Sequence, residues 1–134
     1  MNRKAWLLAL IAFALLLPMP CKAATPAIKG QWTGQWYSMY LKQSGNIIVS
    51  IKQVSTTISG TVYFPGSTCP GPFAFRGNVT SSGKVIMNGV MPCGGYNIRF
   101  VVNGWVHGNR FAAGGYGQSY AGEWYDFGSF VIRR

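Results

Sequence analysis

Residues 46–64 read NIIVSIKQVSTTISGTVYF, and this stretch decides the fold class. Ile47, Val49 and Ile51 stand at every second position of its first half. The second half repeats the alternation with Ile58, Gly60, Val62 and Phe64. Side chains that recur with a period of two lie on one face of a β-strand. The stretch therefore predicts two successive strands, each with one apolar face.

The same pattern continues along the chain, where helical periodicity is almost absent. Glycine, β-branched and aromatic residues are frequent, and none of them favours long helices. Further strands are expected at residues 30–41, 73–79, 84–90, 96–102 and 122–132, with a short piece at 105–107 that could resume at 110–113. We predict an all-β chain, an antiparallel up-and-down meander of seven to eight strands that closes or nearly closes into a small barrel. A flattened β-sandwich is the alternative.

Short turn signals separate most of these strands. The tight-turn dipeptides are Ser44-Gly45, Ser82-Gly83, Gly94-Gly95, Asn103-Gly104 and Gly108-Asn109. Connections this short pair sequential strands antiparallel. Residues 65–72 are expected to form a longer loop. The Gly/Tyr-rich run 114–122 is interpreted as a mobile loop, with a glycine-bent pair of strands as the alternative.

A polar-Gly-x-apolar pattern recurs along the chain, around Gly60, Gly77, Gly89 and Gly104. Glycine inside a strand marks a bulge or a sharp bend. One bend per strand suits a sheet that coils tightly enough to close. Closure also removes exposed sheet edges, which matters for a sheet with few charges.

The opening Gly30-Gln31-Trp32 of the first expected strand resembles the Gly-x-Trp motif of the calycins, which include lipocalins, avidins and bacterial protease inhibitors. The resemblance implies an up-and-down barrel in which Trp32 packs across the closed end. It also implies a basic residue near the C-terminus over that tryptophan. Arg133 and Arg134 are the candidates, and Arg133 is taken as the structural partner. The resemblance covers one short motif and the strand count, and it implies no particular ligand.

Residues 1–23 have the organisation of a bacterial export signal. A basic start precedes an unbroken apolar run at residues 5–17, too short for a membrane span of about 20 residues. Cleavage after Ala23 would leave residues 24–134 as a single β-barrel domain. A cut after Ala24 is also possible, and an uncleaved membrane anchor is the alternative. We therefore expect a periplasmic or extracellular protein with no transmembrane segment in its mature part.

The three cysteines have two different predicted roles. Cys21 allows a lipid-modified N-terminus, but residues 18–20 match poorly the small residues that such a signal needs. Cys69 and Cys93 are the only cysteines of the mature part, and in an exported protein we expect them to form a disulfide bond. Two free thiols are the alternative.

The charge composition excludes most hydrolytic and metal-dependent chemistry. Twelve Lys and Arg side chains face only two carboxylates, Glu123 and Asp126, for a net charge of +10. A spacing of three sends these two to opposite faces of a strand, so we expect an ion pair with Arg99 or Arg110 and no acid–base pair. The single histidine, His107, is expected to be a partly exposed strand-end side chain. We predict no enzyme, no catalytic residue, no metal site and no cofactor.

Aromatic side chains are the remaining candidates for binding a ligand or a partner, because Trp and Tyr provide large contact areas. The candidate ligand-binding residues are Trp36, Tyr40, Tyr63, Tyr96, Trp105, Tyr116 and Tyr120. Packing in the core is the alternative role for most of them. We predict an exported binding module that recognises a small apolar ligand or a protein partner through the barrel mouth and its loops.

Two other functions remain open at the level of sequence. An inhibitor of a secreted protease would use the extended segment 25–30 or a loop. Without residues 1–23 the formal charge is +7, which suits an electrostatic binder of anionic envelope polymers. Aromatic residues beside basic ones also suit single-stranded nucleic acid, but export makes that partner a poor fit.

Overall fold

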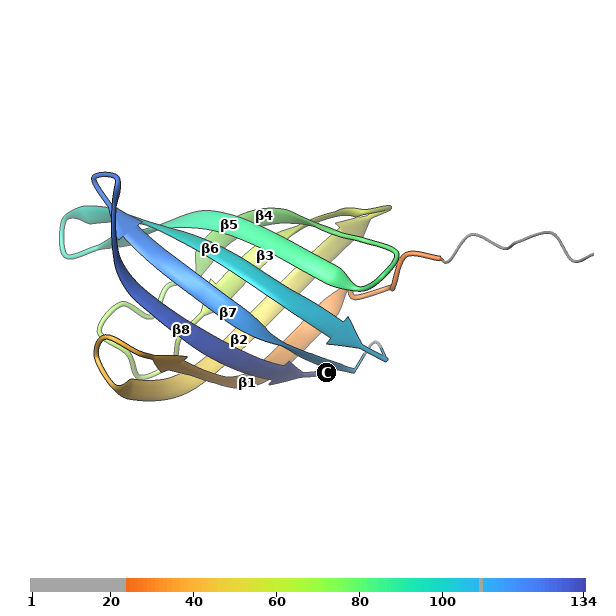
Figure 1. Cartoon of the computed structure of the whole chain (residues 1–134), viewed down its shortest axis with the longest axis horizontal. Helices are drawn as coiled ribbons and strands as arrows, with labels where there is room; N and C mark the ends of the chain where they lie inside the picture. Colours follow the sequence, from red (N-terminus) through yellow and green to blue (C-terminus); the bar gives the residue numbers. More distant parts are fainter. Residues whose placement is uncertain (1–23, 109) are drawn as a thin grey trace, which may run out of the picture.

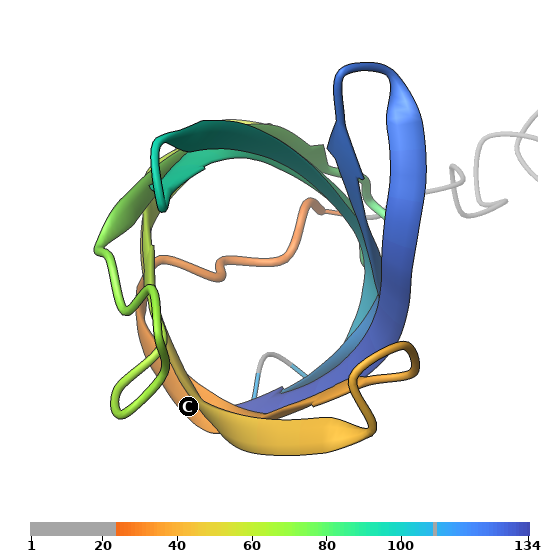
Figure 2. The same ribbon diagram turned by 90° about the vertical axis from the view of Figure 1, so that its left-hand side faces the viewer.

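The computed structural model describes residues 24–108 and 110–134, which form one closed β-barrel (Figure 1). The strands are β1 (Gly30–Ser38), β2 (Gln43–Val54), β3 (Thr57–Tyr63), β4 (Phe73–Val79), β5 (Lys84–Cys93), β6 (Tyr96–His107), β7 (Phe111–Tyr120) and β8 (Glu123–Arg133). Each strand pairs antiparallel with the next, and β1 pairs with β8 to complete the ring in Figure 2. The predicted closed meander is confirmed, and the sandwich alternative is excluded.

The predicted export signal, together with Cys21, lies outside the described residues. Within residues 24–108 and 110–134, no helix has the length and apolarity needed to cross a bilayer.

In the glycine-rich run 114–122, residues 114–120 are strand and 121–122 are the turn to β8. The interpretation as a loop was therefore wrong, and the alternative of a glycine-bent pair of strands is the one that the structure shows. Residues 114–120 make up most of β7, which pairs with β6 on one side and β8 on the other. At Gly114 the two strands approach so closely that a Cβ would collide with the carbonyl oxygen of Asn103 on β6. Glycine thus replaces the branched apolar residues by which a strand is usually recognised. The piece expected separately at 105–107 is the end of β6.

Two predicted turn dipeptides also lie inside strands, Ser44-Gly45 in β2 and Asn103-Gly104 in β6. Their glycines make room for rings inside the barrel instead of reversing the chain. A Cβ on Gly45 would lie 2.9 Å from Nε1 of Trp36, and a Cβ on Gly104 would lie 2.8 Å from the ring of Phe130. A bare backbone at these positions lets large side chains fit within the small ring of strands.

The two ends of the barrel differ. The connections β1–β2, β3–β4, β5–β6 and β7–β8 lie at one end, on the left in Figure 1, and we call it the open end. The C-terminus and residues 24–29 lie at the opposite end, which we call the closed end. Figure 2, viewed from the open end, shows residues 24–29 crossing the ring. The N-terminal segment therefore covers one mouth of the barrel and leaves the other uncovered.

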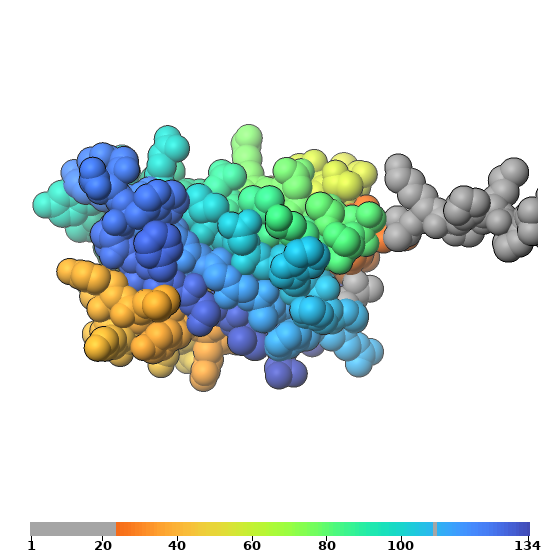
Figure 3. Space-filling model, in the orientation of Figure 1, coloured from red at the N-terminus to blue at the C-terminus, as the bar shows by residue number. Residues whose placement is uncertain are grey.

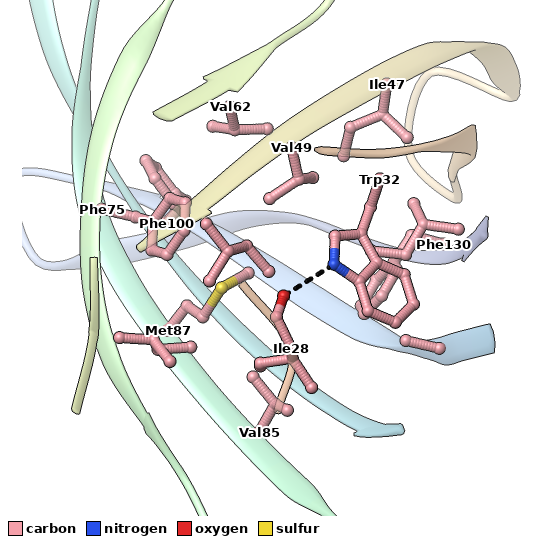
Figure 4. Packing of buried hydrophobic residues seen from close by; sticks show 14 of the residues in the cluster. Ile28, Trp32, Ile47, Val49, Val62, Phe75, Val85, Met87, Phe100 and Phe130 are labelled. Atoms are coloured by element: carbon pink, nitrogen blue, oxygen red, sulfur yellow. Dashed lines mark hydrogen bonds between the residues drawn. The ribbon is translucent and has the colours of Figure 1, made fainter. Parts of the chain in front are cut away.

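A hydrogen-bonded plug fills the closed end. Ile28 and Trp32 are each only 1% exposed, and the Trp32 Nε1–H donates to the carbonyl oxygen of Ile28 at 2.9 Å (Figure 4). Gln53 of β2 holds the same segment, because its Oε1 accepts from the Ile28 N–H at 2.7 Å and its Nε2 donates to Pro26 at 2.9 Å. The N–H and the carbonyl of Ile28, the buried residue of the crossing segment, are thus both hydrogen-bonded.

Arg134, and not Arg133, is the basic residue over Trp32. Its guanidinium lies 5.0 Å from the centre of the Trp32 ring and donates to the carbonyl oxygens of Lys29 at 2.9 Å and Ala27 at 3.2 Å. Arg133 lies 5.0 Å from the ring of Phe111 and is exposed. Neighbouring residues of a strand point to opposite faces, so only one of the two arginines can reach the plug.

Candidate functional site at the open end

The barrel is hollow toward its open end. The cavity there has a volume of about 510 Å³, within the range of about 300–1,000 Å³ typical of small-molecule sites. Most of its wall is apolar and comes from the inward faces of the strands. The apolar lining residues include Ile47, Val62, Met87, Met91, Ile98, Phe100 and Val102. A molecule in this cavity would be surrounded mainly by hydrocarbon and thioether groups.

One wall of the cavity carries a buried carboxylate. Asp126 of β8 is 3% exposed and lines the cavity. Its Oδ1 accepts from the Ser38 hydroxyl at 2.8 Å and from the Tyr40 N–H at 3.2 Å, and its Oδ2 accepts from the Tyr116 hydroxyl at 3.2 Å. All three donors are uncharged, so the predicted ion pair of Asp126 with an arginine is replaced by a set of neutral hydrogen bonds.

Burial and this carboxylate together affect two tyrosines. Burial, and then the nearby negative charge of Asp126, raise the pKa of Tyr116 well above its ordinary value of about 10. The same two causes raise the pKa of Tyr125, whose hydroxyl donates to Oε1 of Gln118 at 2.8 Å. Both phenols therefore remain protonated at neutral pH and act as hydrogen-bond donors at the cavity wall.

Aromatic rings flank the cavity near its mouth. Trp36 and Phe64 meet edge to face, with ring centres 6.2 Å apart, and Phe64 packs against Phe73 at 6.3 Å. The buried Nε1–H of Trp36 has no hydrogen-bond partner among the described residues. An unpaired buried donor lowers stability by about 1–3 kcal/mol. An acceptor atom of a bound molecule would remove that penalty.

A disulfide bond fastens the longest loop to the mouth. Cys69 in the β3–β4 loop is bonded to Cys93 at the end of β5, and both cysteines line the cavity. The predicted pairing is confirmed. The bond fits a non-reducing environment and limits how far the loop can move from the mouth.

The structure brings two of the seven predicted ligand-binding residues to the cavity, Trp36 and Tyr116. The other five do not line it, and they lie largely exposed on the outer surface: Tyr40, Tyr63, Tyr96, Trp105 and Tyr120. Figure 3 shows the β1–β2 turn in orange, which includes Tyr40, protruding at the open end. A ligand-binding role for the five outer residues stays a prediction, and the geometry of the cavity does not support it.

Sequence reasoning missed Ser38 and the role of Asp126 in the cavity wall. The alternation of β8 carries the signal, because Asp126 is in phase with the buried Phe130 and Ile132. Glu123 is out of phase and exposed, so the expectation of opposite faces for the two carboxylates is met. His107 is exposed at the end of β6, as expected, with its ring 5.7 Å from that of Phe111.

No protein-family model matches the chain, and no curated protein sequence matches it. Among solved structures, the chain is similar to one described as "Structure of EF1p2_mFAP2b bound to DFHBI", with a TM-score of 0.59 and 10% sequence identity. The match covers 80% of this chain and 93% of that one. The architecture fits a calycin-like barrel. At 10% identity the likeness shows the fold alone.

Proposed function

We propose that this chain is an exported, non-catalytic binding protein that carries a small, largely apolar ligand inside the open end of its barrel. The observation that carries the proposal is the cavity of about 510 Å³, apolar on most of its wall and opposite a plugged end. Burial of apolar ligand surface supplies about 25 cal/mol per Å². A cavity of this size can therefore bind a small molecule without further machinery.

Two further observations support the proposal. The similar solved structure, EF1p2_mFAP2b, is described as bound to DFHBI, so a barrel of related shape binds a small molecule. The disulfide bond of Cys69 and Cys93 fits export, because such bonds persist in oxidising compartments.

The test is calorimetric titration with n-decanol, a neutral apolar probe, of the wild type and two matched variants. Ile98→Trp fills the cavity from its wall, whereas Val90→Trp adds the same side chain at an exposed position of the neighbouring strand β5. We expect saturable binding to the wild type and to Val90→Trp, and at least about tenfold weaker binding to a folded Ile98→Trp. The proposal is wrong if the wild type does not bind, or if both variants bind equally.

A second function, binding of anionic envelope polymers, is favoured by the positions of the basic residues. Six of the nine in residues 24–134 lie at or near the closed end: Lys29, Lys52, Lys84, Arg110, Arg133 and Arg134. Like charges gathered at one end attract anions over about a Debye length, roughly 8 Å at physiological salt. Retention on an anionic polymer that does not change between low and high salt would argue against this function.

The protease-inhibitor hypothesis loses one of its two proposed contact segments. Residues 25–30 were expected to extend toward a protease, but the segment crosses the closed end with Ile28 buried beside Trp32. The hypothesis now depends on the open-end loops.

A further inference from the structure

We propose that the ligand of the open-end cavity carries a basic nitrogen, which Asp126 binds as an ammonium group, while an apolar body fills the rest of the cavity. This inference rests on the proposed function and adds the chemical class of the ligand. It comes from the environment of Asp126, the positions of the charges along the barrel and the aromatic lining.

The Asp126 carboxylate lacks a cationic partner in the cavity. No Lys, Arg or His occurs among the described residues that line it. Three neutral donors bind the carboxylate, two at Oδ1 and one at Oδ2, whereas two carboxylate oxygens offer about four acceptor sites. A buried charge is costly unless it is paired. A ligand ammonium would supply the missing positive charge and the remaining hydrogen bond.

The charges of the barrel are arranged along its axis in a way that favours a cation at the open end. Both carboxylates belong to the part of β8 near that end, with Glu123 as the first residue of the strand. Among residues 24–108 and 110–134, only Lys42 and Arg99 are basic residues of the open end, and Arg76 lies midway along β4. The strong positive charge of the chain is thus concentrated far from the mouth, and a cationic ligand would not be repelled there as it would be at the closed end.

Aromatic lining adds to this preference. Trp36, Phe64, Tyr116 and Tyr125 all line the cavity that contains Asp126. The face of an aromatic ring attracts a cation, most strongly when both are shielded from water. A carboxylate and several rings in one cavity are suited to an amine joined to a hydrocarbon body, and they offer nothing cationic to a carboxylate ligand.

The experiment compares three probes of equal chain length, n-decylamine, n-decanol and n-decanoate, by calorimetric titration. The wild type is measured beside Asp126→Asn, which keeps the size of the side chain, and Glu123→Gln, which removes the same charge at an exposed site of the same strand. We expect the wild type to bind decylamine at least about tenfold more tightly than decanol, and decanoate most weakly. Asp126→Asn should reduce the advantage of decylamine over decanol to about twofold or less, whereas Glu123→Gln should retain that advantage.

Each negative result contradicts either the ammonium inference alone or both that inference and the proposed function. No advantage of the amine in the wild type, an advantage that survives in Asp126→Asn, or an equal loss in Glu123→Gln overturns this inference and leaves the apolar carrier in place. Absence of binding by all three probes overturns both. If Asp126→Asn does not fold, the carboxyl carbon resonance of Asp126 in the wild type decides the matter. It should shift on addition of decylamine and not of decanol, and an unmoved resonance rejects the inference.

Discussion

The closed and open ends of this barrel are built from the same eight strands but use aromatic side chains in opposite ways. At the closed end, Trp32 is fully buried, its Nε1–H is paired with Ile28, and Arg134 covers its ring. At the open end, Trp36 is partly exposed beside a cavity, and its Nε1–H is unpaired. Satisfied and packed groups stabilise a fold, whereas an unpaired buried donor lowers its stability, so the two tryptophans contribute differently to the barrel.

The largest effect on stability should come from replacing Trp32 or Trp36 with alanine in two separate variants. Trp32→Ala empties the plug and should lower the free energy of unfolding by about 3–5 kcal/mol. Trp36→Ala removes a partly exposed ring and an unpaired donor. It should therefore lower the free energy of unfolding by less than half as much as Trp32→Ala. Urea unfolding of both variants measures the difference. Equal losses would show that the open end contributes to stability as much as the plug does.

Removal of the disulfide bond should have the next largest effect. In the loop-entropy model, replacing Cys69 and Cys93 with serine should cost about 3 kcal/mol, since the bond spans a sequence separation of 24. Hydrogen exchange should speed up most in the β3–β4 loop, beyond the acceleration that the lower global stability causes at Trp32. An equal acceleration at the loop and at Trp32 would contradict the view that the bond also restrains the loop locally.

The two C-terminal arginines provide a finer comparison at the closed end. Arg134→Ala loses two bonds to backbone carbonyls and the contact with Trp32, and should destabilise the barrel by about 1.5–2 kcal/mol. Arg133→Ala loses only an exposed contact with Phe111, worth about 0.5–1 kcal/mol. Thermal unfolding of the two variants shows which one is destabilised more. A larger loss of stability in Arg133→Ala would show that Arg133, and not Arg134, supports the plug.

The smallest effect concerns Tyr116 at the open end. Its pKa is raised in the folded state, so above pH 10 the unfolded chain releases this proton while the folded chain still retains it. The stability that Tyr116 contributes is complete below about pH 10 and is lost as the pH rises further. Tyr116→Phe should therefore flatten the decline of the unfolding free energy above pH 10. Identical alkaline slopes for the wild type and Tyr116→Phe would contradict this.

Much of the fold, and part of the closed end, could be predicted from the sequence. Alternation in residues 46–64 predicted the antiparallel strands, because period-two burial is a local property of a strand. The one-bend-per-strand glycines favoured closure but left a sandwich as the alternative, since closure depends on the pairing of β1 with β8. The plug was predictable as far as Trp32 from the Gly-x-Trp resemblance. The choice between Arg133 and Arg134 was not, since it depends on which face of β8 meets the barrel end.

The candidate site was harder to predict because it is assembled across distant strands. Ser38 and Asp126 are separated by 88 positions, and only closure of β1 on β8 brings them together. A pattern along the chain gives the face on which each residue lies, but not its neighbour on the adjacent strand. The exposed positions of Tyr96 and Tyr120 show the same limit, because these rings pair with each other outside the barrel at 5.0 Å.

The proposal that the closed end is packed and the open end binds a ligand is tested most directly by amide chemical-shift mapping during a titration with n-decanol. We expect saturable shifts in the strands around the cavity, including Met91, Ile98 and Val102, and no shift at Ile28 and Trp32. Saturable shifts at the plug or on the outer aromatic residues alone, or no saturable shifts at all, would contradict it.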